Sequence, residues 1–537
     1  MKIAIAQINS NVGALEDNLT RALDTDAKLA SLPDDQRPDL VVYPAAVLTG
    51  GPLDGLLVSP TFFEASQKAL ERFAEQVRIP ALVRGYVLVD SYDDEAPLEE
   101  QLDPDYEDFL ISPEVFCIEH GQLQALGFSE SALMEAIGVP FGDQKLIIRL
   151  SDPEQIDDLL YDNDILITMP DRPLNLADED VCDKSFIRKL EVLARDTQTW
   201  VFVANRVGGQ DHVVYPGGSC IISNDGHYQE GGVFFDETVL LADTSAPLPE
   251  KVELDFPDID KVRWLALCTA TRDYVRKNGF TDVVVGLSGG LDSALIATIA
   301  ADALEPGHVH AILMPSEHSS AGSITDAQAL AANLGIKTIT LPIDEPFRAT
   351  RETMASVLGQ EVTGVARENM QARIRTLYLM TLSNMNGWLL LNTGNKSEAA
   401  MGFSTLYGDT AGAFAPLGNV YKTELYALAR WRNTYGDVIP DAILTKAPSA
   451  ELYDGAKDSD RLPPYEDLDD ILQLYLEDGL TCDEIVLEGH TPEVVKSVLA
   501  AVARSEYKRR CEPMAPVFEN IDLTEERDWP VTNRYHD

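Results

Sequence analysis

Short apolar runs alternate with amphipathic stretches along the first 245 residues. Runs with the length of buried strands occur at residues 2–7, 40–43, 164–167 and 200–204. Residues 62–77 instead carry apolar side chains at helical spacing, and the acidic, proline-containing stretch 91–108 indicates an exposed loop. Strands separated by helices predict a layered α/β domain.

The pattern changes near residue 246. Residues 246–249 are Ala-Pro-Leu-Pro and Pro257 follows, which indicates an extended linker. Beyond it the pattern predicts a helix over 260–277, a buried strand over 282–287 and a further helix over 294–304. We therefore predict two domains, residues 1–250 and 251–537, without internal repeats or low-complexity tracts.

Composition and charge narrow the class of protein. The chain has 537 residues, too many for one core, and 45% of them are hydrophobic, as in folded globular proteins. A net charge of -47 repels nucleic acid and anionic membranes, so neither is an expected partner. The chain shows no secretory or bilayer-spanning pattern, which favours a cytoplasmic protein. Its six cysteines include no C-x-x-C pair, which argues against a zinc site.

The strongest chemical signal is the hexapeptide 288–293, Ser-Gly-Gly-Leu-Asp-Ser, between a predicted strand and a predicted helix. Gly289 and Gly290 allow a tight turn that presents backbone N–H groups, and the helix N-terminus adds a partial positive charge. Such a loop binds phosphate. Because a carboxylate repels phosphate, Asp292 is interpreted as a Mg2+ ligand.

This loop resembles the signature of the ATP pyrophosphatase family, whose members cleave ATP to AMP and pyrophosphate while activating a substrate. Later segments resemble the long-form NAD+ synthetases of that family. Each segment by itself could be a solvated helix face or a surface acid, but their order is specific to these synthetases. The similar segments are 314–316, 368–375, 392–398, 407–409, 416–422, 448–452, 462–465, 506–510 and 530–534.

The resemblance implies a reaction and a set of residues. Nicotinic acid adenine dinucleotide would be adenylated by ATP and then amidated to NAD+, with Mg2+ held by Asp292 and Glu398. Asp409 and Lys422 would be catalytic. ATP contacts are implied for Ser288, Gly289, Gly290, Asp292, Ser293, Met314 and Thr393, and substrate contacts for Asn369, Arg373, Lys396, Glu451 and Lys508. One departure is Ala456, where the family usually has Gln, so one contact to the dinucleotide or its loop is expected to be lost.

Residues 1–245 resemble the nitrilase-type amidase domain of long-form synthetases, which hydrolyses glutamine with a Glu, a Lys and a Cys. In this chain the Glu position is Ala45, the Cys position is Leu150 and the Lys position is Ser129. We therefore predict a nitrilase-like α/β sandwich that is catalytically inactive and serves as a scaffold, followed by a doubly wound parallel-sheet ATP pyrophosphatase domain.

The nitrogen donor expected from these losses is ammonia, free or supplied by a separate protein. A homo-oligomer is also expected, because long-form enzymes assemble through the amidase domain. Three alternatives stay open: a glutamine-dependent synthetase with a non-standard glutaminase site, an ATP pyrophosphatase acting on another carboxylate, and a non-catalytic nucleotide-binding scaffold. The intact hexapeptide and Glu398 argue against the scaffold, since a scaffold needs no metal ligands.

Overall fold

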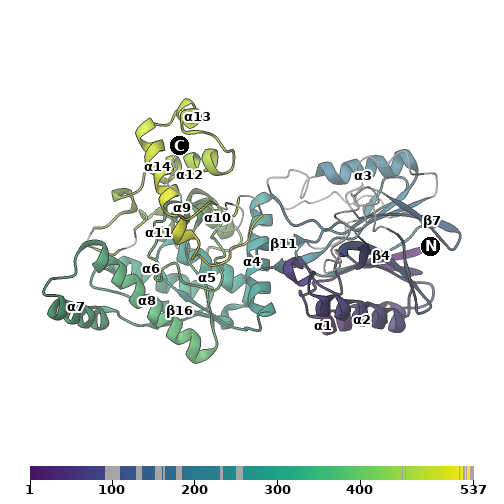
Figure 1. The fold of residues 1–537 in the computed structure, drawn as a ribbon, viewed down its shortest axis with the longest axis horizontal. Coiled ribbons are helices and arrows are strands. Elements are labelled where there is room, and N and C mark those ends of the chain that lie inside the picture. Colours follow the sequence, from purple (N-terminus) through teal and green to yellow (C-terminus); the bar gives the residue numbers. More distant parts are fainter. Residues whose placement is uncertain are drawn as a thin grey trace, which may run out of the picture. The chain divides into compact units, whose positions relative to one another are not determined.

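The chain forms two compact units in the computed structural model (Figure 1). The front unit is built from Met1–Leu174, Asp178–Gln210 and Tyr215–Pro257, and the C-terminal unit from Asp258–Asp537 with the short segments Asn175–Ala177 and Asp211–Val214. Val213 belongs with the C-terminal unit because it forms a β-bridge with Val517. The structure describes residues 1–90, 109–127, 136–150, 160, 164–176, 184–229, 234–248, 258–449, 451–453, 455–518, 521–523, 527 and 529–532.

Two six-stranded sheets make up the front unit. The first has the order β14 (Thr238–Asp243), β1 (Lys2–Gln7), β2 (Leu40–Val42), β3 (Ala81–Asp90), β4 (Phe109–Glu119) and β5 (Gln122–Ala125). The second has the order β13 (Tyr228–Gln229), β12 (Cys220–Ile222), β9 (Trp200–Val203), β8 (Ile165–Thr168), β7 (Gln144–Arg149) and β6 (Ile137–Phe141). A separate pair joins β10 (Val207–Gln210) and β11 (Val213–Pro216).

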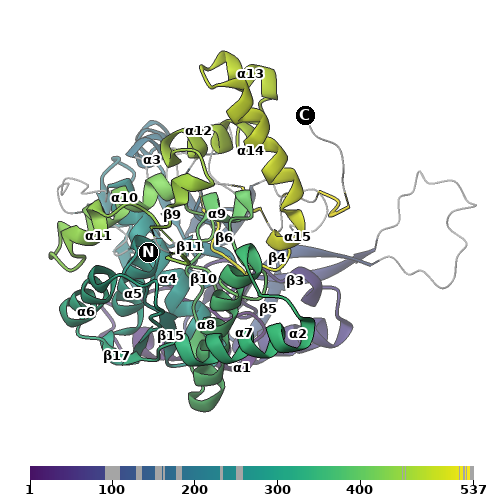
Figure 2. The ribbon, with the colours of Figure 1, turned by 90° about the vertical axis from the view of Figure 1, so that its left-hand side faces the viewer.

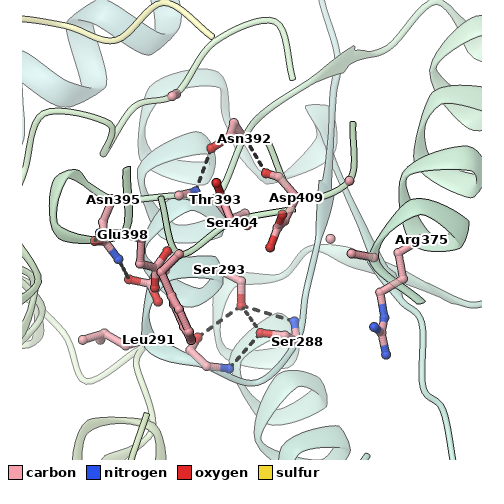
Figure 3. A pocket seen from close by; sticks show the side chains of 18 of the residues that line it. Ser288, Leu291, Ser293, Arg375, Asn392, Thr393, Asn395, Glu398, Ser404 and Asp409 are labelled. Carbon is pink, nitrogen blue, oxygen red and sulfur yellow. Dashed lines mark hydrogen bonds between the residues drawn. The ribbon is translucent and has the colours of Figure 1, made fainter. Parts of the chain in front are cut away.

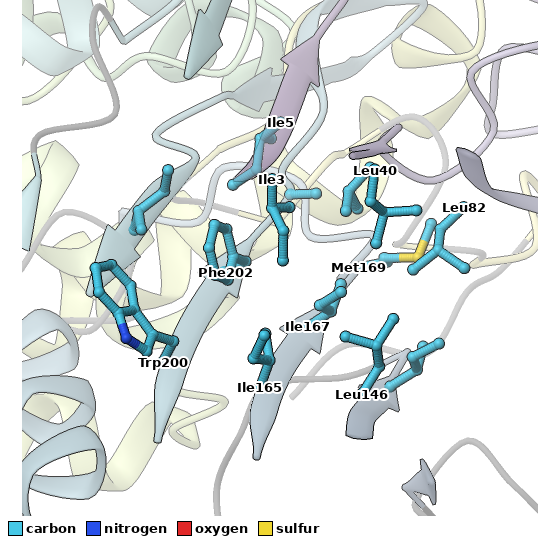
Figure 4. Close-up of a cluster of buried hydrophobic side chains, with 14 of the residues drawn as sticks. Ile3, Ile5, Leu40, Leu82, Leu146, Ile165, Ile167, Met169, Trp200 and Phe202 are labelled. Atoms are coloured by element: carbon cyan, nitrogen blue, oxygen red, sulfur yellow. The ribbon is translucent and has the colours of Figure 1, made fainter. Parts of the chain in front are cut away.

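The side chains of alternate residues divide each strand between two cores. Ile3 and Ile5 of β1 point into the core between the sheets, where Ile167 and Phe202 of the second sheet meet them (Figure 4). Ala4 and Ala6 of β1 face the other way, and pack with α1 (Leu15–Ala30) and α2 (Pro60–Gln76). On the second sheet, α3 (Lys184–Thr197) covers the outer face. The unit is thus the expected α/β sandwich, with one layer of helices on the outer face of each sheet.

Most predicted elements of the front unit lie within two residues of their observed bounds. The runs at 40–43, 164–167 and 200–204 become β2, β8 and β9, and the helical pattern at 62–77 becomes α2. The predicted loop at 91–108 falls outside the described residues.

The C-terminal unit contains one parallel sheet. Its order is β17 (Lys337–Thr340), β16 (Val309–Leu313), β15 (Val283–Gly286) and β18 (Leu389–Leu390). The chain runs outward from β15 through β16 to β17, then returns to the other side of β15 as β18. Ligands of doubly wound sheets bind at the carboxyl ends of the strands where the order reverses, which here lies between β15 and β18.

Helices cover both faces of this sheet, which confirms the doubly wound prediction (Figure 2). On one face lie α5 (Leu291–Leu304) and α6 (Ala321–Leu334), with α4 (Ile259–Lys277) behind α5. On the other face α8 (Gly364–Asn386) packs against Val284, Ile312 and Leu390, and α7 (Asp344–Leu358) contacts α8.

A further helical layer follows in the sequence. Its core includes Ala400 and Tyr421 together with the apolar faces of the later helices. The elements are α9 (Lys396–Met401), α10 (Lys422–Asn433), α11 (Asp441–Thr445), α12 (Tyr465–Leu476), α13 (Cys482–Leu487), α14 (Pro492–Arg504) and α15 (Glu506–Arg509). Residues 392–422 run from the end of β18 through α9 to the start of α10. They bring side chains that are distant in sequence from β15 to the end of that strand.

Candidate active site

The hexapeptide forms a turn between β15 and α5 that requires glycine at position 289. Gly289 has φ +83°, and a Cβ atom there would lie 2.2 Å from the backbone oxygen of Ser323. L-residues rarely adopt this conformation, and the backbone of α6 leaves no room for a side chain. The sequence prediction of a strand–turn–helix is therefore confirmed by both the backbone and its packing.

Serine hydroxyls brace the loop from inside. The Ser288 and Ser293 hydroxyls lie 3.0 Å apart, and the Ser288 N–H donates to the Ser293 Oγ at 3.2 Å. The Gly290 N–H donates to the Ser288 Oγ at 3.1 Å. Gly290 caps α5 without a side-chain hydrogen bond, so the first-turn N–H groups are available to an anion.

A lysine and two carboxylates meet beside the loop. Lys422, 3% exposed, places its Nζ 2.5 Å from the Asp292 Oδ2 and 3.6 Å from the Glu398 Oε1. Asn395 donates to the Asp292 Oδ1 at 3.1 Å and also caps α9, whose first turn carries Glu398 (Figure 3). Residues from α5, α9 and α10 thus converge on one charged centre.

Burial governs the protonation of this centre. Burial raises the pKa of Glu398 to about 8; Lys422 lowers this pKa, whereas Asp292 raises it further. Burial disfavours the Lys422 ammonium, but the charges of Asp292 and Glu398 outweigh it, and the pKa of Lys422 rises. At neutral pH Glu398 is therefore largely protonated, and the charges of Asp292 and Lys422 compensate each other.

A divalent cation would allow both carboxylates of this centre to be charged, and their oxygen atoms suit such an ion. Among the described residues, no three His, Cys, Asp or Glu side chains form a complete metal cage. Mg2+ is usually held by only one or two carboxylates together with substrate phosphates and water. Asp292 and Glu398 are oxygen donors of that kind, and they lie beside an anion-binding turn.

Asp409 lines the same cavity as the phosphate loop. The Thr405 N–H donates to the Asp409 Oδ1 at 2.5 Å, and the Asn392 side chain donates to the Asp409 backbone oxygen at 2.8 Å. Burial raises the pKa of the Asp409 carboxyl, although the hydrogen bond from Thr405 lowers it. Figure 3 shows Asn392, Ser404 and Asp409 close together above the loop.

Arg375 and the loop that carries Glu451 form another part of the cavity wall. Arg375 of α8 donates to the Met314 backbone oxygen at 3.2 Å, and burial lowers its pKa to about 10, which leaves it charged at neutral pH. Glu451 accepts hydrogen bonds from the Ser323 hydroxyl at 2.6 Å and the Ser320 N–H at 3.2 Å. Met314 and Thr393, both predicted ATP contacts, also line the cavity.

Four predicted substrate contacts have other partners. Lys396 is fully buried, and its Nζ lies 2.7 Å from Glu477. Lys508 donates to the backbone oxygens of Gly402 and Ser404 at 2.7 and 2.6 Å. Arg373 donates to a backbone oxygen, and Asn369 accepts from Thr405. None of these four side chains is among the residues that line the cavity.

Sequence reasoning missed several cavity residues. Arg375 lay in a segment similar to the synthetases, but nothing in its spacing marked it out from Arg373. Asn395 carried a detectable signal, because Asn before a helix predicts an N-cap. Lys446 and Glu512 also line the cavity and carried no sequence signal. The backbone of Ala456, the site of the expected lost contact, accepts a hydrogen bond from Ser449 at 2.5 Å.

The front unit places apolar side chains at two of the three amidase positions. Ala45 is 1% exposed and Leu150 is 3% exposed, with Leu150 in the core between the sheets. Ser129 lies outside the described residues. Burial raises the pKa of Cys117 to about 11 and that of Cys220 to about 12. Since the thiolate is the nucleophilic form, neither of these cysteines is prepared for attack.

None of the helices in the described part of the chain is both long enough and apolar enough to cross a membrane.

Comparison with known proteins gives a consistent result. The family model described as NAD synthase matches residues 263–512. Two proteins named glutamine-dependent NAD(+) synthetase are similar over the whole chain. The protein of Thermotoga maritima is 33% identical, and the match covers 100% of this chain and 99% of that protein. The protein of Aquifex aeolicus is 32% identical, and the match covers 100% of both chains.

Two solved structures also match almost the whole chain. The glutamine-dependent NAD+ synthetase of Acinetobacter baumannii, in complex with ADP, matches with a TM-score of 0.70 and 28% identity, covering 99% of this chain and 98% of its own. That of Cytophaga hutchinsonii matches with a TM-score of 0.78 at 17% identity and 99% and 98% coverage, which shows the shared fold.

Proposed function

The chain belongs to the NAD synthase family, and we propose that it makes NAD+ by ATP-dependent amidation of nicotinic acid adenine dinucleotide, with ammonia as the nitrogen donor. The observation that carries this proposal is one cavity that holds a phosphate-binding turn, the Asp292–Lys422–Glu398 centre and Asp409. The structural relative solved with ADP supports a nucleotide in such a cavity.

In the first half-reaction the loop and the N-terminus of α5 bind the ATP phosphates. The substrate carboxylate attacks the α-phosphorus, the bond to the bridging oxygen breaks, and pyrophosphate leaves. Lys422 is held by Asp292 in a preorganised position, so its charge stabilises the negative charge that develops on the phosphate oxygens. Arg375, held by the Met314 backbone oxygen, supplies a second positive charge in the same cavity.

Asp292 and Glu398 are the residues that would hold Mg2+. The bound ion supplies further neutralisation of the phosphate charge. Glu398 has to release its proton to serve as a ligand. Lys422 contacts both carboxylates and so holds them beside the turn before the nucleotide arrives.

In the second half-reaction ammonia attacks the carbonyl carbon of the adenylate and AMP leaves. Asp409 orients the incoming nitrogen and accepts a proton from it. Its carboxylate is held by the Thr405 N–H and so presents a fixed acceptor to the cavity.

The choice of ammonia rests on the front unit. Hydrolysis of glutamine by an amidase of this type needs a nucleophile and a general base, and the corresponding positions hold the buried side chains of Leu150 and Ala45. The second candidate is glutamine, favoured by the names of the full-length relatives. On our proposal the front unit acts as a scaffold, including for assembly into a homo-oligomer.

The deciding experiment supplies ATP, Mg2+ and nicotinic acid adenine dinucleotide with either ammonium or glutamine. NAD+ from ammonium alone is the expected result. Formation of NAD+ and glutamate from glutamine would refute the proposal that the front unit is inactive, but it would agree with the proposed NAD+ synthesis. NAD+ from neither donor would refute the proposed reaction, and ATP cleavage with other carboxylates would then separate a related ligase from a non-catalytic scaffold.

A further inference from the structure

Glu512 is an acidic residue of the cavity wall that neither the sequence motifs nor the reaction above uses. It follows α15 and lines the cavity together with Ser404, Asp409 and the phosphate loop. The Ser404 hydroxyl donates to the Glu512 Oε1 at 3.3 Å. Ser404 and Asp409 belong to one connecting segment, so Glu512 contacts the segment that carries Asp409.

The cations near these carboxylates are engaged elsewhere. Lys508 donates to two backbone oxygens, and Arg509 pairs with Glu506 at 2.7 Å. Among the described residues, no lysine or arginine forms an ion pair with Glu512 or Asp409. The two carboxylates thus line a cavity with unused capacity for a small cation.

The electrostatic environment agrees with that geometry. Burial raises the pKa of Glu512 to about 7 and the charge of Asp409 raises it, while the Ser404 hydroxyl, Lys508 and Arg509 lower it. Asp409 is likewise raised by burial, and Lys508 and Arg375 lower it. An acceptor with a pKa near the working pH is the most effective one for a proton in transit.

We propose that Glu512, together with Asp409, binds ammonium from solution and takes its first proton, so that ammonia is formed beside the adenylate. The inference deepens the proposed function and rests on it. A front domain that hydrolyses glutamine delivers neutral ammonia, whereas a chain without that activity meets mostly ammonium at neutral pH. Ammonium carries one more proton than ammonia, and the Glu512 carboxylate supplies the acceptor for that proton.

The proton balance calls for two acceptors. Ammonium gives one proton to Glu512, and the nitrogen lone pair then forms the C–N bond with the adenylate carbonyl carbon. The resulting intermediate loses a second proton to Asp409. The C–O bond to AMP breaks, and its electron pair leaves with AMP, so that the products are the amide, AMP and two protons held by carboxylates.

The test compares Glu512→Gln with the full-length wild-type protein in NAD+ formation across ammonium concentrations from pH 6.5 to 9. Glu512→Gln preserves size and the hydrogen bond from Ser404. We expect KM for ammonium to rise at least about tenfold, with KM for ATP unchanged. The variant's kcat/KM should then rise about tenfold per pH unit with the fraction of free ammonia, whereas the wild-type profile is flatter.

Two controls separate this role from a structural one. Cys511→Ser changes the exposed neighbour in the same turn, and Glu488→Gln removes the same charge from an exposed position; both should behave as wild type. Equal ammonium KM and equal pH slopes in wild type and Glu512→Gln would overturn the inference. So would a variant with a lowered melting temperature and weakened ATP use, since Glu512 would then serve the fold. Wild-type protein inactive with ammonium would instead refute the proposed function.

Discussion

Replacement of Lys422 by Met tests the charged centre most directly. The variant keeps the aliphatic stem and removes the ammonium that lies 2.5 Å from Asp292 and 3.6 Å from Glu398. At an effective dielectric constant of about 20, two unit charges about 4 Å apart attract each other by about 4 kcal/mol. Lys422 is 3% exposed and its two partners are 19% and 22% exposed, so solvent replaces little of this attraction.

The expected cost to stability is smaller than the summed attraction. Removing one partner of a buried pair costs about 3–5 kcal/mol. The lower end applies, because Glu398 can stay protonated when its cation is lost. For a unit of this size each kcal/mol shifts the melting temperature by roughly 2–4 °C, so a shift of roughly 6–12 °C is expected. Loss of the fixed charge at the phosphates should also lower kcat by about 10²–10³-fold.

The assays are thermal unfolding and pyrophosphate exchange into ATP in the presence of the dinucleotide. Lys496→Met provides the matched control, because it removes the same charge from an exposed position on α14. The double variant Lys422→Met with Asp292→Asn should recover part of the melting temperature but no activity, since the uncompensated carboxylate is gone. A single variant that melts within about 1 °C of wild type and keeps its exchange rate would refute the reasoning.

Three further outcomes are expected. Gly289→Ala should lose ATP binding, measured by calorimetry, and should destabilise the C-terminal unit by more than about 2 kcal/mol. The control Gly359→Ala, at φ +68° with open space around the Cβ position, should cost about 1 kcal/mol. Equal losses of stability in the two variants would contradict the packing argument. Asp409→Asn should slow NAD+ formation from ammonium by about 10²-fold while pyrophosphate exchange continues, and parallel loss of both would assign Asp409 to the first half-reaction. Iodoacetamide at pH 8 should label Cys511 but neither Cys117 nor Cys220 in the native protein, as read by mass spectrometry. Burial raises the Cys117 pKa from 9.0 to about 11, so the thiol ionises first in the unfolded chain and the front unit loses stability as pH rises from 9 through 11; rapid labelling of Cys117 would reopen the search for a nucleophile.

Local sequence determined those features that depend on the backbone of one segment. Short continuous apolar runs predicted β2, β8 and β9, and the two glycines with flanking serines predicted the turn between β15 and α5. Each of these signals lies within a few residues, because the length of a buried strand and the geometry of a turn are set by neighbouring peptide units. The resemblance to NAD+ synthetases assigned Asp292, Glu398 and Lys422 to one site, and in the structure the Lys422 ammonium lies 2.5 Å from Asp292 and 3.6 Å from Glu398.

Tertiary packing decided which charged side chains face the cavity and which support the fold. Lys396 and Lys422 occur in similar motifs and both are almost fully buried, yet one pairs with Glu477 in the helical layer and the other with Asp292 at the nucleotide turn. Glu512 carries no local signal, and its environment arises only because the chain after α15 places it against Ser404, in the segment that carries Asp409. Burial and charge pairing depend on the distance between elements far apart in sequence, and those distances set the pKa values and hence the chemistry.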